Sequence, residues 1–425
     1  MDDRYDVVIA GAGPAGGQCA RDLAARGYDV LVLETESEDV FPRTSNKSTA
    51  GTFPRMMTAF GVPDDVVMHY TTNVVLESPN NHYTAEQPGA VLDFGAFKRW
   101  LVEDSREHGA EYRFDTRARA PIVENGDVIG VEFGKEGQVF ADIIIDATGP
   151  AAPLAKQLGL VDLRRENHAI GIEWEYEDVH VSHPDMPDVA DAMMLRLDHD
   201  LAPGGYAWIF HTGADTAKVG LCYIQNNRHL EFAEDGFSID DYLERWLGRD
   251  PRLVDASIIE GKHAHRGSAH IQHPGRMSTD SFMAIGDTVP SIDPVWGEGI
   301  HNCMESGRAA AIAADQALTG IVDTSASKLA LYDQLWHQRV APNMENRLML
   351  AELLYLADND RFDRLMADLN RLPDDTLAKA NAGNKRAIMK LLHAEDLPQL
   401  VKFAKERLGF GTGSRFVQGG SPASG

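Results

Sequence analysis

A glycine-rich turn, Gly11–Gly16 (GAGPAG), narrows the choice of fold more than any other part of the sequence. It follows a buried strand pattern at 5–10 and opens a helical pattern at 14–26, and a second strand at 30–33 ends on Glu34. In dinucleotide-binding folds such glycines permit the tight turn, the approach of backbone to a pyrophosphate and close helix–strand packing, while the acidic residue accepts hydrogen bonds from ribose. A glycine turn without a ligand is the alternative. The pattern predicts a Rossmann-type nucleotide site that includes Gly11, Gly13, Ala15, Gly16 and Glu34.

A second segment far along the chain indicates which nucleotide is bound. Gly286-Asp287 follows the apolar strand 282–285, and Pro294–Ile300 (PVWGEGI) leads into a helical pattern at 299–319. A carboxylate at a strand end can accept hydrogen bonds from a ribityl chain, and a helix N-terminus can stabilise negative charge on a reduced flavin. The alternative for Asp287 is a simple helix cap. A simple NAD dehydrogenase has no need of this segment, so we predict FAD, with further contacts from Gly149, Asp287, Pro294, Gly297, Gly299 and Ile300.

The middle of the chain has a different pattern from both ends. Strand-like segments dominate at 171–177, 192–197, 206–211 and 218–223, which favours an antiparallel sheet. Asn125-Gly126 predicts a hairpin turn. The expected fold class is α/β (α+β), with a Rossmann-type domain, an antiparallel-sheet substrate domain and C-terminal helices. The expected parts are a discontinuous FAD domain at 1–168 plus 266–325 (with 60–100 partly in the substrate domain), a substrate domain at 169–265, helices at 326–408 and a disordered Gly/Ser-rich tail at 409–425.

Composition excludes some function classes. The chain has 65 acidic and 40 basic residues and a formal net charge of −25, which argues against a nucleic-acid partner. An acidic surface suits concentrated salt, although an ordinary acidic cytosolic enzyme is the alternative. Cys19, Cys222 and Cys303 have no metal-binding or disulfide spacing, so no metal is expected. No signal peptide and no run of about 18 apolar residues is present, which favours a cytoplasmic location.

The motifs together carry a family resemblance. The two nucleotide segments, with Asp146–Gly149 (DATG) between them, resemble flavoproteins related to p-hydroxybenzoate hydroxylase. Gly205–His211 (GYAWIFH) and the following Lys218–Gly220 are similar to the geranylgeranyl reductase family, and the resemblance covers about residues 5 to 320. It implies an FAD-dependent reductase that saturates geranylgeranyl chains of archaeal ether lipids, the digeranylgeranylglycerophospholipids. The acidic composition fits a haloarchaeal member.

The resemblance also implies site residues and shows departures. Family members often have a cysteine where this chain has Ser48, a proline where it has His211 and an arginine where it has Phe94. Arg99 is the candidate to supply the missing arginine charge. A serine cannot serve as a readily ionised thiol, so proton delivery needs another group. The resemblance implies further cofactor contacts by Lys47, Ser48, Thr49, Arg99 and Ala118.

The segment Gly205–His211 predicts the substrate wall. Strand alternation places Tyr206, Trp208 and Phe210 on one face. Aromatic residues on one face of a strand more often belong to the packed core. The family resemblance instead favours a wall that faces the lipid substrate. Tyr206 and Trp208 are the catalytic candidates, and Tyr206 is a possible proton donor. The predicted substrate contacts are Tyr206, Trp208, Phe210, His211 and Trp296, although alternation points His211 away from the aromatic face.

Three alternatives to this reductase stay open. The chain can be a flavin monooxygenase, a reductase of another isoprenoid such as a quinone side chain, or a non-enzymatic flavin- or lipid-binding protein. The electron donor, a ferredoxin or NAD(P)H, is undetermined because no second complete nucleotide fingerprint occurs. An isoprenoid lipid substrate implies peripheral contact with the inner face of the membrane. The segment 348–356 is a candidate for this contact. The alternative is that its leucines belong to the buried core.

Overall fold

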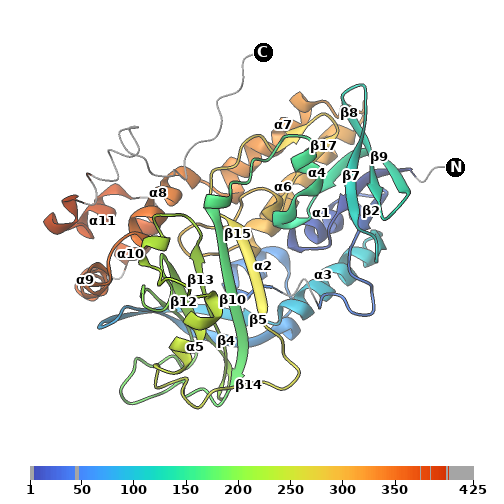
Figure 1. Cartoon of the computed structure of the whole chain (residues 1–425). Helices are drawn as coiled ribbons and strands as arrows, with labels where there is room; N and C mark the ends of the chain where they lie inside the picture. The colour runs from blue at the N-terminus through green and yellow to red at the C-terminus, as the bar shows by residue number, and fades with distance from the viewer. Residues whose placement is uncertain (1–3, 44–46, 374, 383, 399–400, 402–425) are drawn as a thin grey trace.

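The computed structural model describes residues 4–43, 47–373, 375–382, 384–398 and 401, so the predicted tail at 409–425 lies outside the described residues. Figure 1 shows a sheet with helices on its faces at one end of the molecule, a second sheet at the other end and a group of C-terminal helices along one side. The α/β fold class is confirmed.

The first sheet has the strand order β16-β17-β9-β1-β2-β6, and all neighbours from β17 to β6 pair in parallel. Its central strands β1 and β2 are apolar, and their consecutive buried residues show that both faces of the sheet are covered. A hairpin of β7 and β8 turns at Asn125-Gly126, as predicted, and extends the sheet beside β9. The bounds are β1 Arg4–Ala10, β2 Val30–Leu33, β6 Glu111–Arg113, β7 Ala118–Glu124, β8 Asp127–Phe133, β9 Gly137–Asp146, β16 Ser278–Thr279 and β17 Phe282–Ala284.

Small residues let three helices pack closely on this sheet. A Cβ at Gly307 in α6 (Ile300–Leu318) would lie 2.3 Å from the carbonyl oxygen of Ala15 in α1 (Pro14–Ala24). A Cβ at Gly17 would lie 2.8 Å from the side chain of Leu101 in α3 (Phe94–Glu107). The N- and C-terminal parts of the chain therefore share one core, which α7 (Ala326–Leu335) completes.

The second sheet has the order β14-β10-β13-β12-β11-β4-β5-β3, with β15 also paired to β10. All its pairs are antiparallel except β11 with β4. The strands β4 and β5 were not predicted, because Pro88 and Gly89 interrupt the pattern. In the structure Pro88 and Gly89 lie at a bulge, where the register of the β4–β5 pair shifts between Thr71 and Asn73. The bounds are β3 Gly51–Thr52, β4 Val67–Glu77, β5 His82–Leu92, β10 His168–Glu177, β11 Ala192–Arg196, β12 Gly205–Gly213, β13 Thr216–Ile224, β14 Ser257–Ile258 and β15 His265–His270.

The remaining helices cover the second sheet and the junction between the sheets. Phe362 and Met366 of α9 pack with Leu76 and Tyr83 of β4 and β5 in one apolar cluster. The stretch 348–356, named above as a candidate membrane contact, is core at Leu348, Ala351 and Tyr355. None of the described helices is long and apolar enough to cross a bilayer. The bounds are α2 Pro54–Phe60, α4 Pro153–Gln157, α5 Ile239–Leu247, α8 Met344–Tyr355, α9 Asn359–Leu369, α10 Asp375–Asn381 and α11 Lys385–Lys390.

Candidate flavin and substrate site

The glycine turn between β1 and α1 leaves room for a ligand at one position only. A Cβ at Gly11, whose φ is +106°, would lie 2.5 Å from the Ala147 carbonyl oxygen, and a Cβ at Gly16 would lie 2.0 Å from the carbonyl oxygen of Gly11. A Cβ at Gly13 would meet no atom within 4 Å. The outer two glycines are therefore required by packing. Gly13, the N-cap of α1, borders the open space where a pyrophosphate can approach the helix N-terminus.

Glu34 is buried at the end of β2 and holds the turn in place. Its carboxylate accepts hydrogen bonds from the backbone N–H groups of Ala12 (2.9 Å) and Glu36 (2.9 Å). A carboxylate has about four lone-pair sites, so it retains capacity for ribose hydroxyls. The predicted cofactor contact Ala118 is the first residue of β7. It lies two residues after Thr116, whose backbone N–H donates to the Glu34 carbonyl oxygen. Ala118 does not line the large cavity described below.

The two nucleotide segments, far apart in sequence, touch each other. A Cβ at Gly286, whose φ is +57°, would lie 2.6 Å from the Cβ of Ala15. The backbone N–H of Gly149 donates to the hydroxyl of Thr288 at 3.1 Å, which connects the DATG segment to the second motif. The glycine turn, the DATG segment and Gly286-Asp287 thus form one surface, as required for a discontinuous flavin site.

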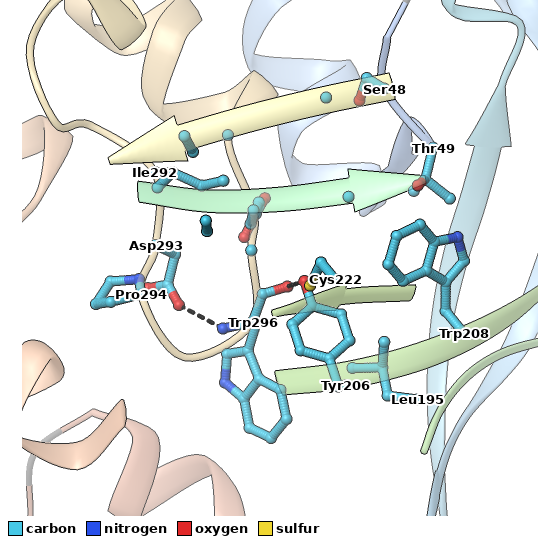
Figure 2. A pocket seen from close by; sticks show the side chains of 18 of the residues that line it. Ser48, Thr49, Leu195, Tyr206, Trp208, Cys222, Ile292, Asp293, Pro294 and Trp296 are labelled. Atoms are coloured by element: carbon cyan, nitrogen blue, oxygen red, sulfur yellow. Dashed lines mark hydrogen bonds between the residues drawn. The ribbon is translucent and has the colours of Figure 1, made fainter. Parts of the chain in front are cut away.

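A cavity of about 700 Å³ begins at this surface and runs between the two sheets. Figure 2 shows Thr49 above Trp208, and Trp296 beside Tyr206. The nucleotide segments contribute residues at one side, and residues of β4, β5, β10, β11, β12, β13 and β15 line much of the rest. The predicted contacts that line it are Lys47, Ser48, Thr49, Tyr206, Trp208, Phe210, Asp287, Pro294, Trp296, Gly297, Gly299 and Ile300.

The aromatic residues of β12 form one wall of this cavity, as alternation predicted. Tyr206, Trp208 and Phe210 line it, while Ala207 and Ile209 point into the core of the second sheet. The Tyr206 hydroxyl donates to the carbonyl oxygen of Trp296 at 3.2 Å. Burial raises the pKa of Tyr206 well above its ordinary value, so this phenol keeps its proton.

A buried polar network, which the sequence patterns do not predict, supports the wall. Glu173 of β10 is 2% exposed and accepts a hydrogen bond from the indole N–H of Trp208 at 2.8 Å. The ammonium of Lys218 donates to the carbonyl oxygens of Thr49 (3.0 Å) and Leu92 (2.9 Å). Hydrogen bonds and nearby positive charge lower the pKa of Glu173 despite its desolvation. The available signal was the charged residues inside the two strands, Glu173 and Glu175 in β10 and Lys218 in β13.

Two acidic side chains of the cavity have raised pKa values. Burial raises the pKa of Asp287 to about 6. Burial and then the nearby charge of Asp293 raise the pKa of Glu298 to about 7, although Arg347 opposes this. A carboxyl group with a pKa near neutrality can act as a proton donor.

The structure does not place His211 in the cavity, and the prediction that it contacts the substrate needs correction. It lies on the opposite face of β12 from the aromatic wall, because adjacent strand residues face opposite ways. Its Nδ1 accepts from the backbone N–H of Asp191 at 2.8 Å and its Nε2 faces the Ala214 carbonyl at 3.0 Å. Arg99 also lies outside this cavity and borders a second, smaller one.

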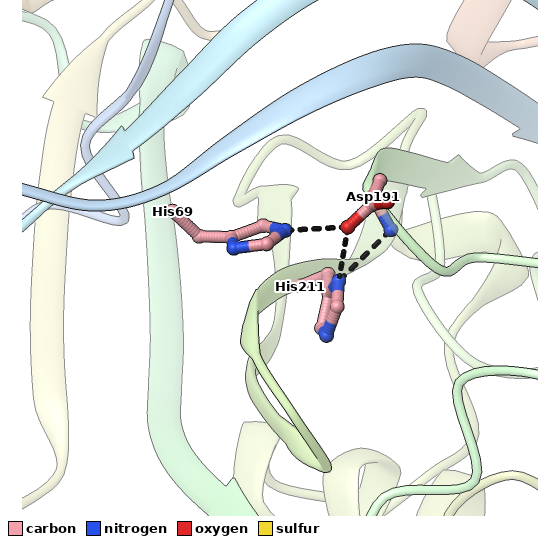
Figure 3. Close-up of side chains that lie close together, drawn as sticks. All are labelled: His69, Asp191 and His211. Atoms are coloured by element: carbon pink, nitrogen blue, oxygen red, sulfur yellow. Dashed lines mark hydrogen bonds and ion pairs between the residues drawn. The ribbon is translucent and has the colours of Figure 1, made fainter.

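Figure 3 shows His211 with Asp191 and His69, whose candidate ligand atoms lie within 4.8 Å of one another. A metal ion needs the lone pair of a histidine nitrogen, but the Asp191 N–H already occupies that of His211 Nδ1. The Nε2 of His69 contacts the Asp191 carboxylate at 2.7 Å. We therefore interpret the cluster as a polar connection between β4, the start of β11 and the end of β12.

The residues present fit FAD. The space beside Gly13 admits a pyrophosphate, the Glu34 carboxylate at the end of β2 would hold the ribose, and Asp287 and the N-terminus of α6 border the large cavity.

Comparison with known proteins agrees with this geometry. The family model described as "FAD binding domain" matches residues 4–341. A digeranylgeranylglycerophospholipid reductase of Haloferax volcanii is 63% identical over 407 residues, which cover 96% of this chain and 99% of that protein. The chain belongs to the digeranylgeranylglycerophospholipid reductase family. Reductase 1 of Methanopyrus kandleri, a more distant member, is 30% identical over 82% of this chain and 90% of its own length.

A solved structure has the same fold as this chain. A geranylgeranyl bacteriochlorophyll reductase-like protein of Thermoplasma acidophilum superimposes with a TM-score of 0.80 at 23% identity, covering 95% of this chain and 99% of that one. A flavin-dependent brominase has a TM-score of 0.70 at 20% identity. The same architecture therefore occurs in flavoproteins of different activity, so the reaction must be argued from the cavity.

Proposed function

We propose that this chain is an FAD-dependent reductase that hydrogenates C=C bonds in the geranylgeranyl chains of archaeal ether phospholipids. The observation that carries the proposal is the cavity of about 700 Å³, which joins the flavin-binding motifs to a long apolar lining. The apolar side chains of that lining include Val74, Leu76, Tyr83, Ala85, Leu195 and Ile292. Membership of the reductase family supports the same conclusion.

The reaction needs a hydride and a proton added across an unactivated double bond, and bound FAD supplies the hydride chemistry. The protein holds the isoprenoid chain against the loop at 294–300, which would face the bound flavin, and excludes water. Tyr206 and Trp208 do this as wall residues. Their orientation is fixed by the bonds to Trp296 and Glu173.

We propose Glu298 as the proton donor. Glu298 lines the cavity between Gly297 and Gly299. A pKa of about 7 means that about half of the molecules carry this proton at neutral pH, and that the carboxyl group releases it readily. The Tyr206 hydroxyl is the poorer acid because burial raises its pKa and Trp296 accepts its hydrogen bond. Ser48, where relatives often have cysteine, donates no proton at neutral pH.

A lipid substrate must reach the cavity from a membrane, and we propose that the C-terminal helices make this peripheral contact. Leu377 and Ala378 of α10 line the cavity. Farther along the chain Met389 is 70% exposed and Leu397 60% exposed. The double substitution M389D/L397D should reduce sedimentation with phospholipid vesicles. Ile321→Asp, at a residue 93% exposed on another part of the surface, should not.

The reaction itself is tested by reducing the purified holoenzyme with dithionite and adding a geranylgeranyl ether phospholipid. Each saturated double bond adds the mass of two hydrogen atoms, which mass spectrometry detects. An unchanged lipid, together with oxygen consumption on another substrate, would replace the reductase by a flavin monooxygenase. Glu298→Gln should slow lipid saturation by about 100-fold or more, as expected for loss of a general acid.

A further inference from the structure

A second cavity, of about 220 Å³, adjoins the proposed flavin and lipid site. Phe94, the first residue of α3, lines both cavities. The small cavity also borders residues of β10 and β13, on the side of the second sheet that faces the 47–50 loop. A ligand held there would thus lie next to the 47–50 loop, which also lines the large cavity.

The lining of this small cavity is rich in positive charge, although the whole chain is strongly acidic. Arg43, Arg99, Lys218 and Lys262 all line it, against two carboxylates. Arginine stays charged at every physiological pH, so the positive charge does not depend on conditions. In a chain with 65 acidic and 40 basic residues, such a cluster creates a local field that attracts anions.

Both carboxylates of the lining already have partners. Glu175 forms an ion pair with Lys262 at 2.8 Å. Asp93 is the N-cap of α3 and accepts the backbone N–H of Ala96 at 2.8 Å. After these pairings the lining retains a positive surplus. The N-terminus of the 14-residue helix α3 adds to it through the helix dipole.

Lys218 couples the small cavity to the large one. Its side chain is 2% exposed and its ammonium donates to the carbonyl oxygens of Thr49 and Leu92. An ammonium carries three N–H groups, so a third can point to an anion in the small cavity. An anion bound there would share Lys218 with the loop that contains Thr49.

We propose that this small cavity binds a phosphate group. Two ligands of the proposed reaction carry that chemistry: a pyridine dinucleotide that reduces the flavin, and the phosphate-bearing head of the lipid substrate. The choice of these two sources rests on the proposed function, whereas the anion site itself rests only on the charges and the cavity. Arg99 gives the site its planar, bidentate phosphate donor.

The site is tested first without turnover. Inorganic phosphate is titrated into the oxidised holoenzyme by calorimetry, with the wild type, Arg99→Gln and R99Q/K262Q. Arg266→Gln is the matched control, because it removes an exposed arginine that pairs with Asp240 outside the small cavity. We expect phosphate binding that weakens with salt and a dissociation constant raised about tenfold or more by R99Q/K262Q. Absence of phosphate binding, or equal loss in Arg266→Gln, overturns the proposal.

The source of the phosphate is tested by two kinetic measurements on R99Q/K262Q. A raised KM for NADPH in flavin reduction, with an unchanged lipid KM under dithionite, assigns the site to the reductant. A raised lipid KM with unchanged NADPH kinetics assigns it to the lipid head group. If neither KM changes, the proposal of a phosphate-bearing reaction ligand is wrong. Because phosphate binding to the oxidised protein needs no lipid reduction, failure of the reductase assay leaves that measurement intact.

Discussion

Replacement of Gly13 by alanine should separate FAD binding from folding. Gly13 has φ −77° and ψ −179°, which alanine adopts without strain, and a Cβ there would meet no protein atom within 4 Å. The folding stability of the apoprotein should therefore be unchanged or raised by about 0.4–1 kcal/mol, since alanine restricts the unfolded chain. The methyl group would instead occupy the space that the pyrophosphate approaches.

The expected loss of FAD affinity follows from the contacts displaced. Loss of one hydrogen bond to a charged phosphate costs about 1.5–3 kcal/mol. Every 1.4 kcal/mol is tenfold in affinity, so the dissociation constant for FAD should rise about 10- to 150-fold. By contrast, a Cβ at Gly16 would lie 2.0 Å from the carbonyl oxygen of Gly11. Gly16→Ala should therefore destabilise the fold as well as weaken FAD binding.

Two measurements on the apoprotein test whether Gly13→Ala weakens FAD binding without affecting folding. FAD is titrated by the quenching of its fluorescence, and unfolding is followed in urea. Gly248→Ala serves as the control, because its φ of −79° suits alanine and a Cβ there would come no closer than 3.5 Å to another atom. A Gly13→Ala apoprotein that unfolds clearly earlier than the wild type would refute the reasoning. So would unchanged FAD affinity.

Three further predictions concern the cavity and the core. Burial raises the pKa of Glu298 to about 7, so the folded protein binds this proton more tightly than the unfolded chain and loses stability as pH rises from about 4.5 to about 7. Apoprotein with Glu298→Gln should thus resist urea better than the wild type at pH 8 and equally near pH 4; the same difference at both values would contradict this. Trp208→Phe removes a donor to buried Glu173, so the lipid KM should rise while FAD affinity stays constant, and a parallel loss of both would argue against a wall role. Glu77→Gln weakens the buried pairing with Arg252, whose guanidinium is fully buried, and should cost about 3–5 kcal/mol in urea unfolding, whereas Asp142→Asn in the surface pair with Arg4 should cost about 1 kcal/mol or less.

Local patterns in the sequence were sufficient for the nucleotide fold. The Gly11–Gly16 turn lies between a strand and a helix, and sterics within that short segment dictate its shape. Period-two alternation likewise placed Tyr206, Trp208 and Phe210 on one face. Such features depend on neighbours in the chain, so they can be recognised without any knowledge of distant contacts.

Features that depend on distant segments were decided by the tertiary structure. The long strands β4 and β5 join the second sheet although Pro88 interrupts their pattern, because pairing with β11 and a bulge compensate for the lost ladder position. The network of Glu173, Lys218 and Thr49 exists only because two strands and a loop from separate parts of the chain meet. Arg99 was expected at the flavin, but the packing of α3 against the second sheet places it at the smaller cavity. A sequence specifies each residue's chemistry, whereas the environment that tunes a pKa or gathers charges forms only when the chain folds.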